Sequence, residues 1–283
     1  MNLDFYRTPM GPSDPGSQAG LFAGLPRGPE RLASVVQGLL MHQHVASTYQ
    51  VTLSETQHAE AHVRSVEEML KQIMAHDARP LQAVRPAGER QVGVCRHFTL
   101  LHVAMLRRQG VPARARCGFG AYFHKEKYVD HWVTEYWSEK RNAWVLFDAQ
   151  LDIHQRALFK TPFDPVDVPR DQFLVAGDCW QLCRAGKADP MDFGILDLFG
   201  WWMIAGNVVR DIAALNNREM LPWDGWRPMP GPEGEVDFAL FDRLAALSHA
   251  PDARFDELRE VYAETLTVPS QVMNAVRNRI EAV

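Results

Sequence analysis

The chain has 283 residues, a formal net charge of −5, 46% hydrophobic residues and 23% charged residues. These values are ordinary for a globular protein with a sizeable core, and they give no indication of nucleic-acid binding. No apolar run of about 18 residues predicts a membrane span. The first residues lack the basic-then-apolar layout of a secretory signal, so we expect a cytoplasmic protein with neither nucleic-acid nor membrane partners.

The N-terminal part is predicted to be an extended arm followed by helices. Residues 1–25 are rich in Gly, Pro and Ser, which favour irregular, extended chain. Apolar residues at helical spacing predict a helix over residues 29–46. Ser54 and Gln57 form a capping box that predicts the start of a second helix. The buried face of that helix is expected to carry four apolar residues: Val63, Val66, Leu70 and Ile73.

A third helix begins with a cysteine. The segment CRHFTLLHVAMLRRQ, residues 95–109, carries a buried stripe at helical spacing, and Gly110 and Pro112 are typical of its end. Cys95 therefore lies at the helix N-terminus. Backbone N–H groups and the positive end of the helix dipole stabilise a thiolate there, and the same N–H groups could bind an oxyanion.

Three strands are predicted after this helix, and two of them supply partners for a thiol. The segments 113–123, 128–137 and 143–148 are rich in aromatic and β-branched residues. His131 lies in the second strand and Asp148 ends the third, and the short turn between these strands can bring them side by side. A thiol, a histidine and a carboxylate are the groups that nucleophilic acyl transfer through a thioester requires.

The stretch 90–152 resembles the transglutaminase-like superfamily, which includes transglutaminases, their microbial protease-like relatives and peptide N-glycanases. The resemblance lies in the segments GVCRHFTLLHVAMLRRQGVPARA, DHWVTEYW and NAWVLFDAQLD. It implies a papain-like Cys-His-Asp triad with Cys95 as nucleophile, His131 as general base and acid, and Asp148 as orienting carboxylate. Candidates for oxyanion or substrate contacts are the Cys95 N–H, Gln91 by residue type, and Trp132.

The sequence departs from the family pattern at three positions. Arg96 and His97 follow the cysteine where the family often has a small or acidic residue. Ala149 follows the aspartate where the family usually has proline. These departures bear on substrate preference more than on the triad.

The resemblance implies an α+β fold in which the Cys-bearing helix packs on an antiparallel sheet, followed here by a helical C-terminal extension. We accordingly predict an N-terminal arm (1–25), a transglutaminase-like catalytic core (26–160) and a mainly helical C-terminal region packed on that core (161–283). Residues 221–234 should be irregular because they are rich in Pro and Gly. The helices expected in the last region are 171–185, 195–217, 236–248, 252–265 and 268–281.

The function predicted from these residues is acyl transfer or hydrolysis at an amide bond of a peptide, protein or small molecule, with no cofactor. The sequence leaves hydrolysis, transfer to an amine and the oligomeric state open. One alternative is an inactive member of the superfamily that binds a peptide or small molecule. Another is a metal-dependent hydrolase using His58 and His62, which lie four apart on a predicted helix. The remaining cysteines are expected to be buried free thiols: Cys117, Cys179 and Cys183.

Overall fold

The computed structural model describes residues 2–283 and contains both helices and strands, which confirms a mixed fold. Its contacts define two compact units. The first unit contains Asn2, Arg116–Trp132 and Pro169–Val283; the second contains Leu3–Ala115 and Val133–Val168. Strands β3 (Ala113–Gly120) and β4 (Tyr128–Ser138) each begin in one unit and end in the other. The predicted boundaries at residues 25 and 160 stay predictions.

The second unit begins with three short 3-10 helices, where an extended arm was expected. They are η1 (Asp4–Tyr6), η2 (Gly11–Ser13) and η3 (Gly16–Phe22). Side chains of the following helices hold this segment in place. The Ser13 hydroxyl accepts a hydrogen bond from Arg107 Nη1 at 2.8 Å, and Ser17 donates to Glu67 Oε1 at 2.6 Å.

Two predicted helices of the second unit are interrupted. The helix expected over 29–46 ends at Leu39, because residues 40–42 pair in parallel with residues 91–93 of a strand far along the chain. The helix expected from Ser54 ends at Glu60, and Ser65 caps a new helix by accepting from the Glu68 N–H at 3.2 Å. The capping box of Ser54 and Gln57 is confirmed. The elements here are α1 (Pro29–Leu39), β1 (Leu40–His42), η4 (Gln43–Tyr49), α2 (Glu55–Glu60), α3 (Val66–His76), η5 (Ala87–Glu89) and β2 (Gln91–Gly93).

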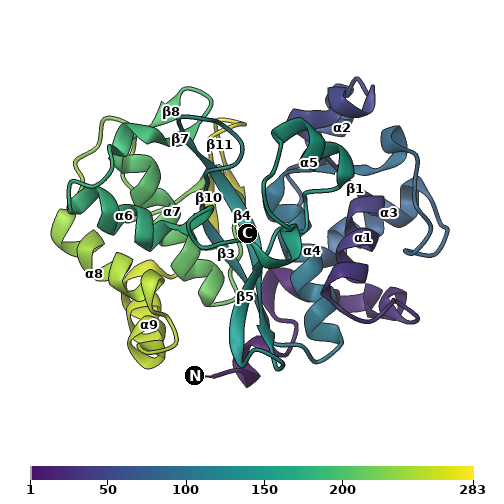
Figure 1. Ribbon diagram of the computed structural model, residues 1–283, viewed down its shortest axis with the longest axis horizontal. Coiled ribbons are helices and arrows are strands. Elements are labelled where there is room, and N and C mark those ends of the chain that lie inside the picture. Colours follow the sequence, from purple (N-terminus) through teal and green to yellow (C-terminus); the bar gives the residue numbers. More distant parts are fainter. Residues whose placement is uncertain (1) are drawn as a thin grey trace. The chain divides into compact units, whose positions relative to one another are not determined.

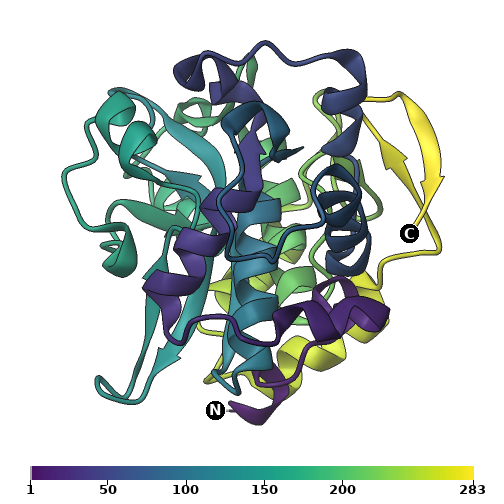
Figure 2. The ribbon, with the colours of Figure 1, turned by 90° about the vertical axis from the view of Figure 1, so that its right-hand side faces the viewer.

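Helix α4 (Cys95–Arg108) is the central helix of the second unit and confirms the predicted cysteine-led helix. It packs against α1 and α3 (Figures 1 and 2). It ends before Gly110, whose positive φ of 77° suits glycine. Residues 134–138 of β4 pair in antiparallel fashion with β5 (Ala143–Phe147), with Thr134 opposite Phe147. Helices α5 (Ile153–Phe159) and η6 (Pro165–Asp167) complete this unit.

The first unit contains a sheet and a group of helices. Its strand order is β6-β3-β4-β7-β8, formed by β6 (Phe173–Val175), β7 (Phe193–Ile195) and β8 (Leu198–Phe199) together with residues of β3 and β4. Helices α6 (Ala176–Arg184), α7 (Trp201–Leu215) and α8 (Phe238–His249) pack against one another (Figure 1). The unit also contains η7 (Pro190–Asp192), α9 (Phe255–Val261) and the π-helical η8 (Tyr262–Leu266). Among residues 2–283, no helix is both long and apolar enough to cross a membrane.

The predicted elements of the first unit are partly right. The helices over 236–248 and 252–265 are confirmed by α8 and by α9 with η8. The helices predicted from 171 and 195 begin later, at Ala176 and Trp201, because short strands come first. The helix predicted over 268–281 is wrong: β10 (Gln271–Asn274) and β11 (Arg279–Ala282) form a hairpin there (Figure 2, yellow). As predicted, residues 221–234 are irregular apart from β9 (Asp224–Gly225).

A buried ion pair joins the sheet of the first unit to its helices. Arg116 of β3 donates to both carboxylate oxygens of Asp211 on α7, at 3.0 and 2.9 Å, and to the Ser248 carbonyl at 2.7 Å. Asp211 also accepts from the Cys117 N–H and from the Ser248 hydroxyl. A buried charge pair is tolerated when further hydrogen bonds satisfy it, as they do here.

Candidate functional site

Cys95 is the first residue of α4 and is 6% exposed. The strand β2 leads directly into it and is held on one edge by its parallel pairing with β1. Glu60 of α2 fixes the same strand, because its Oε2 accepts from the Val92 N–H at 2.7 Å. Burial raises the pKa of Glu60. The position of the cysteine at a helix N-terminus, predicted from the sequence, is confirmed.

His97 secures the start of α4. Its Nδ1 accepts from the Val94 N–H at 3.1 Å, while its Nε2 lies 2.9 Å from the Val63 carbonyl oxygen. A carbonyl oxygen can only accept, so the ring proton is on Nε2 and the imidazole is neutral. Burial, followed by the nearby Arg96 charge, lowers the pKa of His97 to about 3.

The sequence analysis did not assign this function to His97. Its imidazole takes the part that Glu or Gln plays at the third position of a capping box. The sequence V-x-x-H does not match the usual S/T-x-x-E/Q pattern, so the motif passed unrecognised. Gly93 is required beside it, because a Cβ there would lie 2.9 Å from His97 Cβ.

His102, two turns further along α4, holds the helix against its neighbours. Its Nε2 lies 2.9 Å from the Pro29 carbonyl oxygen, and its Nδ1 lies 3.0 Å from Thr134 Oγ1 of β4. Its ring centroid is 4.8 Å from that of Phe147 in β5. Burial lowers the pKa of His102 to about 4. The histidine is thus a buried, neutral packing residue.

His131 lies in β4 within the first unit, surrounded by aromatic rings. It is 2% exposed, and its ring centroid lies 4.6 Å from Phe123, 5.9 Å from Tyr122 and 6.3 Å from Phe173. Trp132 follows it and is fully buried.

Asp130, the residue that precedes His131, contacts a helix of the first unit and not the aromatic rings around His131. Asp130 accepts a hydrogen bond from Asn207 Nδ2 of α7 at 2.7 Å, and burial raises the pKa of this carboxyl group. Side chains alternate along a strand, so Asp130 and His131 point to opposite faces. Asp130 therefore ties the strand to α7, while the His131 ring is packed among the aromatic side chains.

Asp148 directly follows β5 in the second unit and is fully buried. Its backbone N–H donates to the Pro165 carbonyl at 2.9 Å, and its Oδ1 accepts from the Gln150 N–H at 3.0 Å. The carboxylate is therefore held by the local turn that follows the strand. Cys95 and Asp148 lie in one unit and His131 in the other, and the convergence of the three is taken up below as a proposal.

A chain of side-chain hydrogen bonds lies next to Asp148. Gln150 Nε2 donates to Gln155 Oε1 at 2.8 Å, and Gln155 Nε2 donates to the Tyr49 hydroxyl at 3.2 Å. Tyr49 in turn donates to Asp152 Oδ2 at 2.7 Å. Burial, together with the hydrogen bond to Asp152, raises the pKa of Tyr49 well above its usual range. The sequence analysis missed this chain, because Tyr49 and Asp152 are 103 residues apart.

Gln91 begins β2 and is 1% exposed. Its Nε2 donates to Gln72 Oε1 at 3.2 Å, and its Oε1 has no hydrogen-bond partner among residues 2–283. The group that this amide leaves available is therefore an acceptor, whereas an oxyanion needs a donor.

The histidines of the suggested metal site lie at and just beyond the end of α2, with His58 in the helix and His62 after it. The glutamate between them, Glu60, is engaged by the Val92 N–H and lies 3.2 Å from His76. Within residues 2–283, no three His, Cys, Asp or Glu side chains are grouped as a metal ion requires. The metal hypothesis gains no support from this arrangement.

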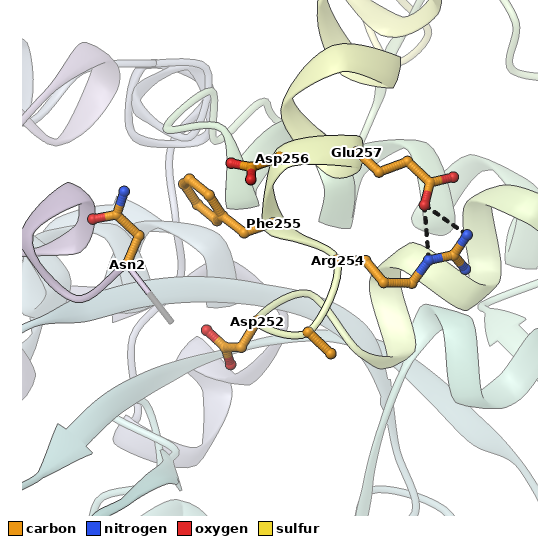
Figure 3. Close-up of a pocket in the computed structure, with 7 residues that line it drawn as sticks. Asn2, Asp252, Arg254, Phe255, Asp256 and Glu257 are labelled. Carbon is orange, nitrogen blue, oxygen red and sulfur yellow. Dashed lines mark hydrogen bonds and ion pairs between the residues drawn. The ribbon is translucent and has the colours of Figure 1, made fainter.

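A pocket of about 510 Å³ lies in the first unit (Figure 3). It is predominantly acidic, and the positive charge of Arg254 is paired with Glu257 at 2.7 Å. None of the predicted site residues lines it. Its lining residues are Asn2, Asp252, Ala253, Arg254, Phe255, Asp256 and Glu257.

Residues 43–149 match the family model described as the transglutaminase-like superfamily. The predicted resemblance is thereby confirmed for this segment, which contains Cys95, His131 and Asp148 in that order.

A solved structure from Cytophaga hutchinsonii, described as a "putative cysteine protease", aligns with 62% of this chain and 45% of its own chain. The identity is 14% and the TM-score is 0.34. The chain therefore spans less than half of that protein, and a likeness this distant supports no conclusion about fold or activity. No curated protein matches the chain.

Proposed function

We propose that the chain catalyses acyl transfer or hydrolysis at an amide bond, with Cys95 as nucleophile, His131 as general base and acid, and Asp148 as the carboxylate that orients His131. The observation that carries the proposal is the position of Cys95 as first residue of α4, inside the segment that matches the superfamily. At a helix N-terminus the dipole and the backbone N–H groups lower a thiol pKa and favour the thiolate.

The proposed reaction has two halves. The Cys95 thiolate attacks the amide carbonyl carbon, and the negative charge moves to the carbonyl oxygen. As the C–N bond breaks, protonated His131 gives its proton to the departing amine, which leaves a thioester on Cys95. Water or a second amine then attacks the thioester while His131 removes its proton; the C–S bond breaks, and the Cys95 thiolate and protonated His131 are regenerated. This scheme uses no cofactor.

The geometry of the second unit supports the fold that this function requires. His102 of α4 contacts Thr134 of β4 and Phe147 of β5, as a cysteine-bearing helix on an antiparallel sheet would do. Continuing the β4–β5 register one step beyond Thr134 and Phe147 sets Asp148 opposite Val133. His131 precedes Val133 by two residues, so alternation gives the two the same strand face. The proposal takes His131 and Asp148 to be neighbours on that face.

The oxyanion is assigned first to the Cys95 N–H. Gln91 stays a candidate second donor, although its amide would first have to release Gln72. Trp132 stays a candidate for substrate contact. Under this proposal residues 26–160 form the catalytic core, residues 161–283 are the C-terminal extension, and the substrate is a peptide, protein or small-molecule amide.

The test is the rate of iodoacetamide labelling, followed by intact mass from pH 5 to 9. Wild type should label rapidly at one site below pH 7, Cys95→Ala should abolish this labelling, and His131→Ala should slow it. Cys183→Ala is the matched control, because burial raises the pKa of Cys183 to about 12 and makes it a poor nucleophile. His58→Ala serves as the histidine control and as a test of the metal hypothesis.

An ordinary thiol response at Cys95, with a pKa of about 8.5, would contradict the proposal. The inactive binding module would then become the better hypothesis. Rapid labelling would justify a screen of amide donors with and without added amines, which separates transferase from hydrolase.

A further inference from the structure

His42 lies beside the backbone that leads into Cys95. Strands β1 and β2 run parallel, and His42, the last residue of β1, is paired with Gly93, the last residue of β2. The chain therefore leaves both strands at the same edge, and the carboxyl edge of parallel strands is where such sheets commonly bind ligands. Cys95 follows Gly93 by two residues. The imidazole and the thiol thus belong to one edge of this small sheet.

The side chains of His42 and Cys95 also share a face. Val94 is extended, with φ −128° and ψ 176°, so Cys95 faces the same side as Gly93, and His42 shares that side through its pairing. The ring centroid of His42 lies 6.3 Å from that of Phe98, which follows Cys95 by about one helical turn. Both residues keep accessible surface, 8% for the histidine and 6% for the cysteine. Neither is sealed from a substrate.

The imidazole of His42 is set as a hydrogen-bond donor. His42 caps the helix η4, and its Nδ1 accepts from the His44 N–H at 3.3 Å. A backbone N–H can only donate, so the proton of the neutral ring is on Nε2. In this tautomer Nε2 cannot take the proton of a thiol, but it can donate to an oxygen that becomes negative.

We infer that His42 is a catalytic residue whose Nε2–H donates a hydrogen bond to the substrate carbonyl oxygen as that oxygen becomes an oxyanion. This inference rests on the proposed function, because it takes Cys95 to be the nucleophile. When the C–S bond forms, the carbonyl electron pair moves to oxygen, and His42 keeps its proton throughout. His42 is thereby the second donor beside the Cys95 N–H. The cap has already placed its proton on Nε2, whereas the donor of Gln91 is engaged by Gln72.

The experiment compares two reagents that modify the same thiol through different transition states. p-Nitrophenyl acetate acylates a thiol through a tetrahedral oxyanion, whereas methyl methanethiosulfonate transfers a methylthio group and contains no carbonyl. Both rates are followed by intact mass at pH 7, and the rates of Cys95→Ala are subtracted. The ratio of acylation to methylthiolation is divided by the same ratio on glutathione, which removes the intrinsic difference between the reagents. We expect this normalised ratio to be well above one in wild type, because only the first reaction uses the oxyanion donors.

Three variants locate the effect. His42→Phe keeps a ring without the donor and should lower the normalised ratio at least about tenfold, since the loss of one oxyanion donor lowers turnover by about 100- to 1000-fold. Its methylthiolation rate should not change. His42→Gln sets an amide N–H near the position of Nε2 and should restore part of the ratio. His44→Ala is the matched control, because it removes a neighbouring imidazole but keeps the N–H that orients His42.

A wild-type ratio of one, or an unchanged ratio in His42→Phe, would overturn the inference, while rapid methylthiolation of Cys95 would leave the proposed function intact. Loss of both rates in His42→Phe would also overturn it, because the ring would then support Cys95 itself and not the oxyanion. Slow methylthiolation of Cys95 in wild type, with no effect of His131→Ala, would instead remove the proposed function and this inference with it.

Discussion

The capping role of His97 makes a quantitative prediction about stability and pH. In the folded chain the imidazole is neutral, and its pKa is lowered to about 3 by burial and by Arg96. In the unfolded chain its pKa returns to about 6.5. Below that pH the imidazole binds a proton in the unfolded state but not in the folded state. The free energy of unfolding therefore has its full value above pH 6.5 and falls as the pH decreases toward 3.

The size of the effect follows from the two pKa values. At pH 5 a histidine that titrates only in the unfolded state lowers the free energy of unfolding by about 2 kcal/mol. His102, whose pKa is lowered to about 4, contributes a similar amount. The titration of these two residues should therefore lower the free energy of unfolding of wild type by about 4 kcal/mol between pH 7 and pH 5.

Two substitutions separate the capping role from the titration. His97→Gln keeps an acceptor at the third helical position but cannot titrate. The decrease in its free energy of unfolding between pH 7 and pH 5 should therefore be about 2 kcal/mol smaller than in wild type. His97→Leu leaves the Val94 N–H and the Val63 carbonyl unpaired in the interior. It should cost about 2–5 kcal/mol at pH 7.

Urea unfolding monitored by circular dichroism at pH 7, 6 and 5 measures these quantities. The pH dependence of wild type is compared with that of His97→Gln, so groups common to both proteins cancel. Parallel stability curves for the two would refute the assignment of a neutral, buried His97. A loss below 1 kcal/mol in His97→Leu would refute its role in securing α4.

Three further substitutions test the supports of the site and of the fold. Gly93→Ala should cost about 1–3 kcal/mol in urea unfolding and should slow Cys95 labelling, because the new Cβ would lie 2.9 Å from a side-chain carbon of the helix. Tyr49→Phe removes the hydroxyl that donates to Asp152 and should lower the free energy of unfolding by about 1–2 kcal/mol in urea unfolding. Asp211→Asn leaves its buried guanidinium partner without a counter-charge and should cost about 3–5 kcal/mol in thermal or urea unfolding. An unchanged unfolding midpoint in any of the three would contradict the corresponding contact.

The elements that the sequence predicted well are those determined by neighbouring residues. Helix α4 has an apolar stripe at helical spacing, a glycine at its end and a proline beyond, and its predicted and observed bounds agree within one residue. The capping box at Ser54 likewise depends on residues three positions apart. The strand that carries His131 and the strand that Asp148 follows show the aromatic and β-branched content that a sheet favours.

The predictions that failed depend on distant partners. Val272, Val276 and Ile280 are spaced by four and imitate a helical stripe, yet the last two are more than 60% exposed. The segment is a hairpin because β10 pairs with β9, almost 50 residues earlier, and Asn278 adopts a left-handed conformation in the turn. In the same way, residues 40–42 leave the helix to pair with a strand about 50 residues later. Local periodicity does not report such pairings.

The functional supports escaped prediction for a different reason. The role of His97 depends on a tautomer set by the carbonyl of Val63, and the Gln150 amide is held by a chain of hydrogen bonds that runs through Gln155 and Tyr49 to Asp152. Both depend on buried polar groups, whose roles are determined by their hydrogen-bond partners and not by their spacing along the chain. Cys95, the proposed nucleophile, was recognisable because its helix position and family pattern are local.

Three buried or half-buried side chains of the second unit, His97, His102 and Tyr49, keep one protonation state across the neutral pH range. His97 and His102 are held neutral by pKa values of about 3 and 4, and the Tyr49 phenol by a pKa raised above its usual range. A titration seen in the Cys95 labelling rate above pH 6 therefore arises in the reacting groups and not in the residues that position them. Near pH 5 the same two histidines weaken the fold through the unfolded state, so a fall in labelling there must be compared with the stability curve before it is assigned to the thiol. A labelling profile above pH 6 that changes in midpoint in His97→Gln would show that this separation is incomplete.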